Sequence, residues 1–245
     1  MNSITESAAS ALRLVFELDP VLMGTVGRSL SVSVTASLLA SALGLVAGGW
    51  LGVSRFKGRE VVLAILNTAL AVPSVVVGLL VYLLLSRSGP LGAWGWLFSF
   101  QAMVMAQSIL VLPVVMALTR QIVEDAEGRH GEQIASMGAQ RGLRSLILAW
   151  DERYALLTVL LAAFGRAISE VGAVMIVGGN IEGYTRVMTT AIALETSKGD
   201  LPLALALGLV LLLVVLLLNA MVAGLRQWRK KIEGDAVTDV LRVLA

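Results

Sequence analysis

The chain has 245 residues, of which 57% are hydrophobic and only 15% charged, and its mean hydropathy is +0.85. A soluble domain of this length does not need so much apolar surface, so the composition indicates an all-α integral membrane protein. The chain has no cysteine and one histidine, which excludes disulfide and thiolate chemistry and an all-histidine metal cluster. The net charge of +2 says little as a total, and the positions of the charges say more.

The N-terminal region predicts a short helix in the membrane interface. Over residues 9–19, Leu12, Val15 and Phe16 fall on one helical face, while Arg13 and Glu17 fall elsewhere. Such a helix lies in the interface plane, and it should end before Pro20.

Five apolar segments follow, each with roughly the 20 residues that a hydrocarbon core of about 30 Å requires. They must be helical, because lipid cannot hydrogen-bond to open backbone groups. The predicted spans are 29–53, 61–85, 101–119, 155–179 and 201–225. This divides the chain into an extracytoplasmic or interfacial segment (1–28), a membrane domain (29–225) with a long polar loop (120–154), and a tail (226–245).

The orientation follows from the distribution of Lys and Arg. Thirteen of the 19 positive residues lie in the loop between the first two spans, in the polar loop 120–154 or in the C-terminal tail. Positive residues favour the cytoplasmic side, so we expect the N-terminus outside and the C-terminus in the cytoplasm of a cell whose inner (plasma) membrane the chain crosses.

The polar segment 120–153 predicts two short helices and a bend. Leu143, Leu146, Ile147 and Trp150 repeat with the spacing of an amphipathic helix. Gly138 precedes that helix, and the chain can turn sharply there because glycine has no Cβ. Such a surface suits docking of a partner, although a plain solvated loop would have the same composition.

Two spans carry features that suit a translocation path or gate. Pro73 frees a backbone carbonyl and can bend its helix. Arg166 and Glu170 are four residues apart and should form a pair inside the fourth span, because neither charge can face lipid. The pair either lines or braces a route through the membrane, or it only fixes helix packing.

The outer segment 180–200 predicts a short helix with hydroxyls along it. Met188, Ala191 and Ile192 set its apolar face, and Thr189 and Thr190 supply the hydroxyls. This helix would cap the outer mouth or meet an extracytoplasmic partner, or it would be an interfacial helix with no further role. We include both threonines among the candidate path residues.

The chain lacks the motifs of an enzyme with its own energy source. There is no G-x-x-x-x-G-K-[ST], no H-E-x-x-H and no G-x-S-x-G. Five spans without a duplicated half are also few for a complete carrier. The simplest reading is half of a symmetric pore, driven by a separate subunit through the polar loop.

The polar loop resembles the coupling loop of ABC importer permeases of the type I, MetI-like fold. That family reads roughly E-A-A, three residues and then G, and here Glu132 and Gly138 stand at the E and the G, followed by Ala139. Gln133 and Ile134 replace the two alanines of the motif. The resemblance assigns ATPase coupling to Glu132, Ala135, Ser136, Gly138, Ala139 and Arg141.

Other stretches are similar to the tungstate permeases within the molybdate/sulfate-type group, above all MIVGGNIEGYTRVMTTAIALETSKGD (175–200). The resemblance implies a homodimer in the lipid bilayer, two cytoplasmic ATPase subunits that bind ATP and Mg²⁺, and an extracytoplasmic oxyanion-binding protein. It implies no cofactor or metal on this chain and no nucleic acid partner. Molybdate or sulfate as cargo, a self-contained channel or secondary carrier, and a non-transporting assembly protein remain as alternatives.

Overall fold

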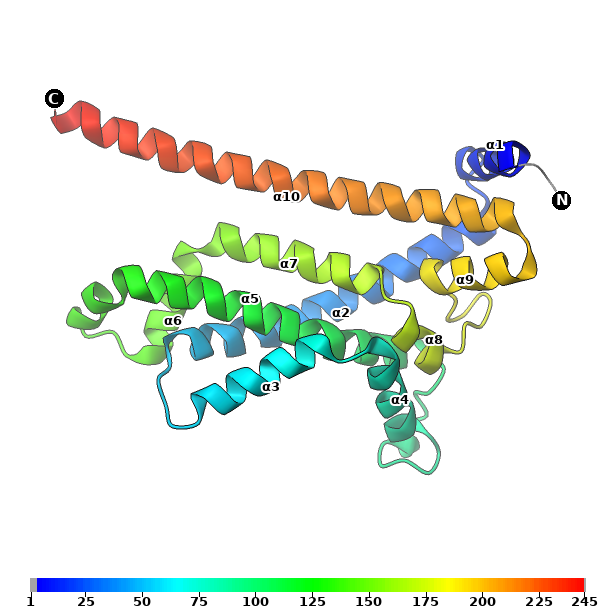
Figure 1. Cartoon of the computed structure of the whole chain (residues 1–245), viewed down its shortest axis with the longest axis horizontal. Coiled ribbons are helices and arrows are strands. Elements are labelled where there is room, and N and C mark those ends of the chain that lie inside the picture. The colour runs from blue at the N-terminus through cyan, green and yellow to red at the C-terminus, as the bar shows by residue number, and fades with distance from the viewer. Residues whose placement is uncertain (1–3, 245) are drawn as a thin grey trace.

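The protein is helical throughout the part of the chain that the computed structural model describes, residues 4–244, and no strand occurs there (Figure 1). The helices are α1 (Ile4–Phe16), α2 (Pro20–Val53), α3 (Arg59–Ala71), α4 (Ser74–Leu85), the 3-10 turn η1 (Gly92–Trp94), α5 (Phe100–Ser136), α6 (Arg141–Asp151), α7 (Arg153–Ile168), α8 (Gly172–Gly178), α9 (Met188–Lys198) and α10 (Leu201–Leu244).

The long helices α2 and α5 form the central pair of the bundle. They meet along a row of small residues on α2, where a Cβ added to Gly48 would lie 2.6 Å from the backbone oxygen of Met116 and one added to Gly44 would lie 2.7 Å from Val115. Small residues let membrane helices approach closely. Pro113 lies inside α5, which continues through it as one helix of 37 residues.

Two predicted spans are broken helices. The segments α3 and α4 meet at an angle of 99° across Val72 and Pro73, and α7 and α8 meet at 59°. Three helices, α2, α5 and the first 25 residues of α10, are long and apolar enough to cross a membrane unbroken. The count rises to five if each bent pair is one span. The predicted spans 61–85 and 155–179 are therefore each divided into two helices, and the bend that Pro73 allows is present in the first of them.

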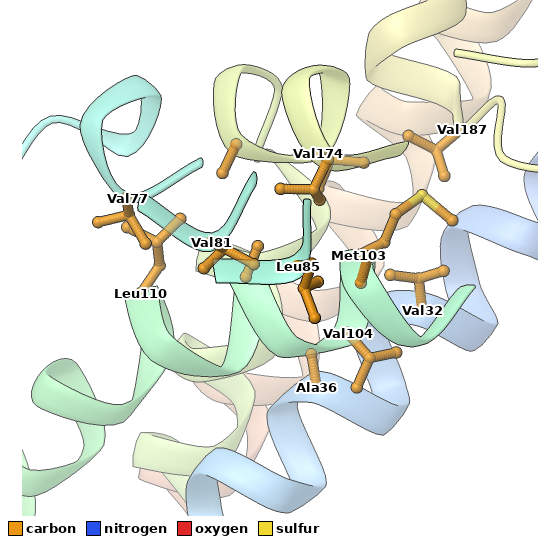
Figure 2. Close-up of a cluster of buried hydrophobic side chains, with 14 residues drawn as sticks. Val32, Ala36, Val77, Val81, Leu85, Met103, Val104, Leu110, Val174 and Val187 are labelled. Carbon is orange, nitrogen blue, oxygen red and sulfur yellow. The ribbon is translucent and has the colours of Figure 1, made fainter. Parts of the chain in front are cut away.

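The largest hydrophobic cluster joins the half-helices to the central pair. Figure 2 shows Val81 of α4 next to Val174 of α8, and Val77 of α4, Met103 of α5 and Val32 of α2 belong to the same cluster. All five are at most 8% exposed. The short helices α4 and α8 thus pack against α5 rather than standing apart from the bundle.

The segment between α8 and α9 is hydrogen-bonded to α2. Arg28 donates from Nε to the backbone oxygen of Arg186 (3.1 Å) and from Nη1 to that of Gly183 (3.2 Å). The hydroxyl of Ser29 accepts a hydrogen bond from the backbone N–H of Met188 (2.6 Å), at the start of α9. The short helix predicted within 180–200 is confirmed as α9, and the helix predicted over 9–19 is confirmed as α1, which begins earlier, at Ile4, and ends at Phe16.

Several predicted boundaries are corrected by these contacts. The first long helix begins at Pro20 rather than at residue 29, because the side chain of Asp19 caps it by accepting from the N–H groups of Val21 and Leu22 (both 2.9 Å). The first half of the polar segment 120–153 is not a separate short helix but the end of α5.

The positively charged segments gather at one end of the bundle. In Figure 1, α6, the loop from α2 to α3 and the C-terminal end of α10 lie on the left, while α1, α8 and α9 lie on the right. This grouping matches the grouping of the basic loops predicted from the sequence.

Candidate functional site

The first candidate site is the α5–α6 turn, which we define as residues 130–151. The helix α5 ends at Ser136, and the chain reverses through residues 137–140. Gly138 has φ +84° and donates its N–H to the oxygen of Ala135 (2.9 Å). A left-handed residue after a helix terminates it by satisfying a free carbonyl, and glycine takes this conformation without steric cost. The predicted bend at Gly138 is therefore confirmed.

Helix α6 is held on the ends of α2 and α5. Its one buried side chain, Leu148, packs with Val53 and Val123. Arg144 pairs with Glu127 of α5 at 2.9 Å, with both side chains 17% exposed. A Cβ on Gly49 of α2 would lie only 2.8 Å from the hydroxyl of Ser145, so α6 rests directly on the α2 backbone. The α5–α6 turn is therefore packed against both long helices, so a displacement of either helix would displace the turn.

The opposite face of the α5–α6 turn is apolar and exposed. Met137 is 78% exposed, Trp150 71% and Leu146 67%. Two hollows, of about 310 and 300 Å³, lie beside Met137 and are lined by residues of both helices, including Ile134 and Ile147. An exposed apolar patch of this kind marks an interaction site.

The residues predicted to couple to an ATPase all belong to the α5–α6 turn, and two of them, Gly138 and Ala139, line one of these hollows. Ala139 is half-buried, and the others are exposed. The exposed members are Glu132, Ala135, Ser136, Gly138 and Arg141.

A cluster of ion pairs fixes the base of this end. Glu124 of α5 accepts from Arg59 of α3 (2.8 Å) and from Arg55 of the preceding loop (3.0 Å), and it also pairs with Arg120. Burial favours a raised pKa for Glu124, but the hydrogen bond and charge of Arg59, with Arg120 and Arg55, outweigh it and hold the pKa below its ordinary value. Only the Arg120–Glu124 pair has the local i, i+4 spacing, and the contacts of Glu124 with Arg59 and Arg55 join residues 65 and 69 positions apart, which spacing does not predict.

The second candidate site is the break junction, where the interrupted helices α3/α4 and α7/α8 meet. Glu170 lies in the gap between α7 and α8, with 4% of its side chain exposed. It accepts from Arg166 (2.8 Å), from the N–H of Ala173 (3.2 Å) and from the hydroxyl of Ser74 at the start of α4. One carboxylate thus joins both breaks. The predicted Arg166–Glu170 pair is confirmed, but it crosses the end of a helix instead of lying within one.

The two half-helices touch at glycine. A Cβ on Gly78 of α4 would lie 2.7 Å from the Cα of Ala173 in α8, and one on Gly172 would lie 2.8 Å from Val75 and 3.0 Å from the hydroxyl of Ser74. The backbones of α4 and α8 are therefore in direct contact beside the Glu170 carboxylate.

The other predicted path residues surround this junction. Pro73 is exposed at the start of α4, and the guanidinium of Arg166 belongs to a side chain that is 41% exposed. Thr189 is buried and donates its hydroxyl to the backbone oxygen of Glu170 (2.7 Å). Thr190 is fully buried, and its hydroxyl accepts from the N–H and donates to the oxygen of Val187, the residue directly before α9.

Two polar residues at the junction were missed by sequence reasoning. Gln107 of α5 is 3% exposed and donates to the backbone oxygen of Ala167 (3.0 Å), at the last turn of α7. Ser74 directly follows Pro73 and bonds Glu170. A buried amide in an apolar span was the available signal for Gln107, since such a group requires a partner.

Known proteins resemble this chain over nearly its whole length, although no protein-family model matches it. The tungstate uptake system permease protein TupB of Peptoclostridium acidaminophilum is 41% identical over 93% of this chain and 100% of its own length. The protein of the same name from Campylobacter jejuni is 37% identical over 89% of this chain and 92% of its own. A probable anion ABC transporter permease protein of Haloferax volcanii is 43% identical over 81% and 88%.

The chain belongs to the family of oxyanion-type ABC transporter permeases. Sulfate transport system permease proteins are more distant members, such as CysT of Escherichia coli, which is 27% identical over 82% of this chain. The permease is a transmembrane transport protein of the inner membrane. The relatives of this chain are named as permease subunits of transporters rather than as enzymes.

Proposed function

We propose that this permease imports tungstate as half of a homodimeric pore, powered by cytoplasmic ATPase subunits. The cargo is supported by the relatives named for tungstate uptake, which are 37–41% identical, against 24–28% for those named for sulfate. Molybdate and sulfate are the alternative cargoes of the same machinery. An extracytoplasmic oxyanion-binding protein would deliver the anion, so binding assays on that partner with each of the three anions decide between them.

The observation that carries the coupling proposal is the exposed apolar face of the α5–α6 turn. We place it in the cytoplasm because it shares an end of the bundle with the other basic loops. Met137, Leu146 and Trp150 then offer a partner protein a compact apolar surface. The partner is an ABC ATPase, which binds the ATP and Mg²⁺ that this chain is not expected to bind.

The break junction is the proposed gate. In a MetI-like bundle of five spans, with α3/α4 and α7/α8 each counted as one bent span, the junction lies within the membrane. Arg166 is half-exposed there, and an exposed guanidinium in the membrane must face water or protein. Facing a second copy across a two-fold axis, two such arginines would bound an anion path. Glu170 lowers their net charge, so the anion would pass without being held.

Variants of the turn test the coupling. The permease is purified with its ATPase, and ATP turnover is measured in the complex. Gly138→Asp places a side chain at φ +84° and adds charge to the apolar face, so we expect a membrane-inserted protein with at least tenfold less stimulated turnover. Gly128→Asp is the matched control, because it adds the same charge to α5 with no atom within 4 Å of the new Cβ.

Normal coupled turnover in Gly138→Asp would contradict the assignment of the turn. Transport of the anion by the purified permease without any ATPase would contradict the whole proposal, and it would favour the self-contained channel or carrier.

A further inference from the structure

The loop between α2 and α3, residues 54–58, has features that neither transport nor ATPase coupling uses. It is five residues long and joins two apolar helices, so it cannot leave the boundary between membrane and water. Three basic residues lie in or directly after it, namely Arg55, Lys57 and Arg59. Trp50 and Phe56 stack beside them, with ring centroids 5.5 Å apart and an interplanar angle of 29°. Aromatic rings at this level anchor a protein in the headgroup region.

A pocket of about 260 Å³ opens in this loop. Its lining consists of Arg55, Phe56, Gly58, Arg59 and Glu60. Arg59 is only 8% exposed, and its Nε has no acceptor within the described part of the chain. An unpaired buried guanidinium donor is costly, so it points to a missing acceptor.

The N-terminus of α3 faces the same region. This helix of 13 residues has no side-chain cap, and its first residues follow Gly58. The N–H groups of Arg59, Val61 and Val62 already donate to the backbone oxygens of Phe56 and Gly58, so within this first turn the N–H of Glu60 and the positive end of the helix dipole are what favour an anion.

The charges around the pocket leave a positive excess. Glu124 forms ion pairs with Arg59, Arg120 and Arg55. The side chain of Glu60 is 88% exposed and lies 3.7 Å from Arg59. Arg55, Lys57, Arg59 and Arg120 carry four positive charges against two carboxylates. Arg55 is itself 66% exposed, and Lys57 is exposed and forms no ion pair among the described residues.

We propose that this pocket binds the phosphate headgroup of an anionic phospholipid. The helix N-terminus and Arg59 would hold the phosphate, Arg55 and Lys57 would supply the preference for an anionic lipid, and Trp50 and Phe56 would lie against the upper acyl chain. A lipid fits better than a free anion because the aromatic pair and the loop stay at headgroup depth. The inference depends on α2 and α3 being membrane helices, and not on the cargo or on ATPase coupling.

The bound lipid would also act on the ion cluster at the base of the α5–α6 turn. Its phosphate would share Arg55 and Arg59 with Glu124, so the occupied pocket would tie the start of α3 to both the membrane surface and α5. Lipid composition would thereby influence the end of the bundle that carries the α5–α6 turn.

The test compares lipid retention by the full chain. The wild-type protein and Arg55→Gln/Lys57→Gln are purified in detergent, titrated with phosphatidylglycerol or with phosphatidylcholine, and examined by native mass spectrometry. We expect one phosphatidylglycerol to bind the wild type more tightly than phosphatidylcholine, and binding to weaken by roughly tenfold or more in the double variant. Arg59 is left intact because it is the buried partner of Glu124, whereas Arg55, which also reaches Glu124, is 66% exposed. Arg13→Gln/Arg87→Gln, which removes the same charge elsewhere, should keep the tight lipid.

Free anions form the second arm of the test. Inorganic phosphate and tungstate at millimolar concentration should neither displace the lipid nor raise the melting temperature of lipid-free protein. Stabilisation by either anion that is lost in Arg55→Gln/Lys57→Gln, without a preference for phosphatidylglycerol, would overturn the proposal in favour of a soluble oxyanion. Equal lipid retention by the wild type and the double variant would overturn it as well.

Discussion

The bundle contains one straight helix pair, α2 and α5, and two broken pairs, α3/α4 and α7/α8. The straight and the broken pairs differ in the groups that hold them together. The α2–α5 interface is built mainly from glycines of α2 packed against the backbone and valines of α5, and the hydroxyl of Ser108 on α5 donates to the backbone oxygen of Ala36 on α2 (3.3 Å). The break junction holds Arg166, Glu170, Ser74 and Gln107 at points where helices stop. Close backbone packing resists deformation, whereas a break with exchangeable hydrogen bonds permits it. We therefore expect α2 and α5 to stay rigid relative to each other, and the broken helices α3/α4 and α7/α8 to move.

The largest effect is expected from disturbing the straight pair. Gly48→Leu would place atoms 2.6 Å from the oxygen of Met116 and 2.9 Å from Thr119, and the helices would have to separate. Overpacking of this kind costs about 1–3 kcal/mol or more, so little folded protein should reach the membrane. Size-exclusion profiles of solubilised protein measure this. Gly27→Leu on the same helix, with nothing within 4 Å of its Cβ, is the control and should behave as the wild type.

A smaller stability effect but a large loss of transport is expected at the break junction. Glu170→Gln keeps an acceptor for the N–H of Ala173 but leaves Arg166 without its charge partner. We expect a loss of about 1–3 kcal/mol, discounted because Arg166 is half-exposed, and anion uptake at least tenfold lower. Thermal denaturation and uptake by cells measure the two quantities. Glu182→Gln, which removes an exposed partner of Arg186, should change neither.

The double variant Arg166→Gln/Glu170→Gln separates bracing from gating. Both roles predict recovered stability, because no unpaired charge remains. If the pair only braces the bundle, uptake should recover too. If Arg166 bounds the path, uptake should stay low, and its recovery would remove Arg166 from the gate.

The smallest effect is a pH-dependent one at the Glu124 cluster. The folded-state pKa of Glu124 is lowered, so its contribution to stability is present above the ordinary carboxyl pKa of 4.5 and is lost as the pH falls through the folded value. Glu124→Gln should therefore lower the melting temperature at pH 7 by about 2–4 °C, and the difference from the wild type should shrink at pH 4 and below. A difference that is independent of pH would show that the charge of Glu124 does not matter.

Sequence reasoning predicted the helices and allowed a bend at Pro73, but it could not show where a helix would break. Pro73 stands at a bend of 99°, whereas Pro113, the proline of the third predicted span, lies inside a continuous helix. The difference is tertiary, because α4 turns to place Gly78 against α8, whereas Pro113 is buried within α5 and its neighbours. The i, i+4 spacing correctly paired Arg166 with Glu170. The same spacing could not show that Glu170 also accepts from the N–H of Ala173 in the first turn of α8, because this contact depends on where α7 ends.

The α5–α6 turn was easier to predict than the ion cluster beneath it. Gly138 and the apolar spacing of α6 are local signals, and both were confirmed. Glu124 meets Arg55 and Arg59 only because α3 returns alongside α5, and no spacing in the sequence encodes that contact. Local chemistry thus identified the exposed surface, while long-range contacts decided what holds it.

The hydrogen bonds of Arg28 to the segment before α9 have a mechanical consequence. Two backbone oxygens, 155 and 158 residues further along the chain, accept hydrogen bonds from one guanidinium near the start of α2. In the proposed orientation, an oxyanion-binding protein that docked on the segment before α9 would therefore push on α2, whose other end contacts α6. Docking of the loaded partner would tilt this helix and displace α6 before any anion had moved.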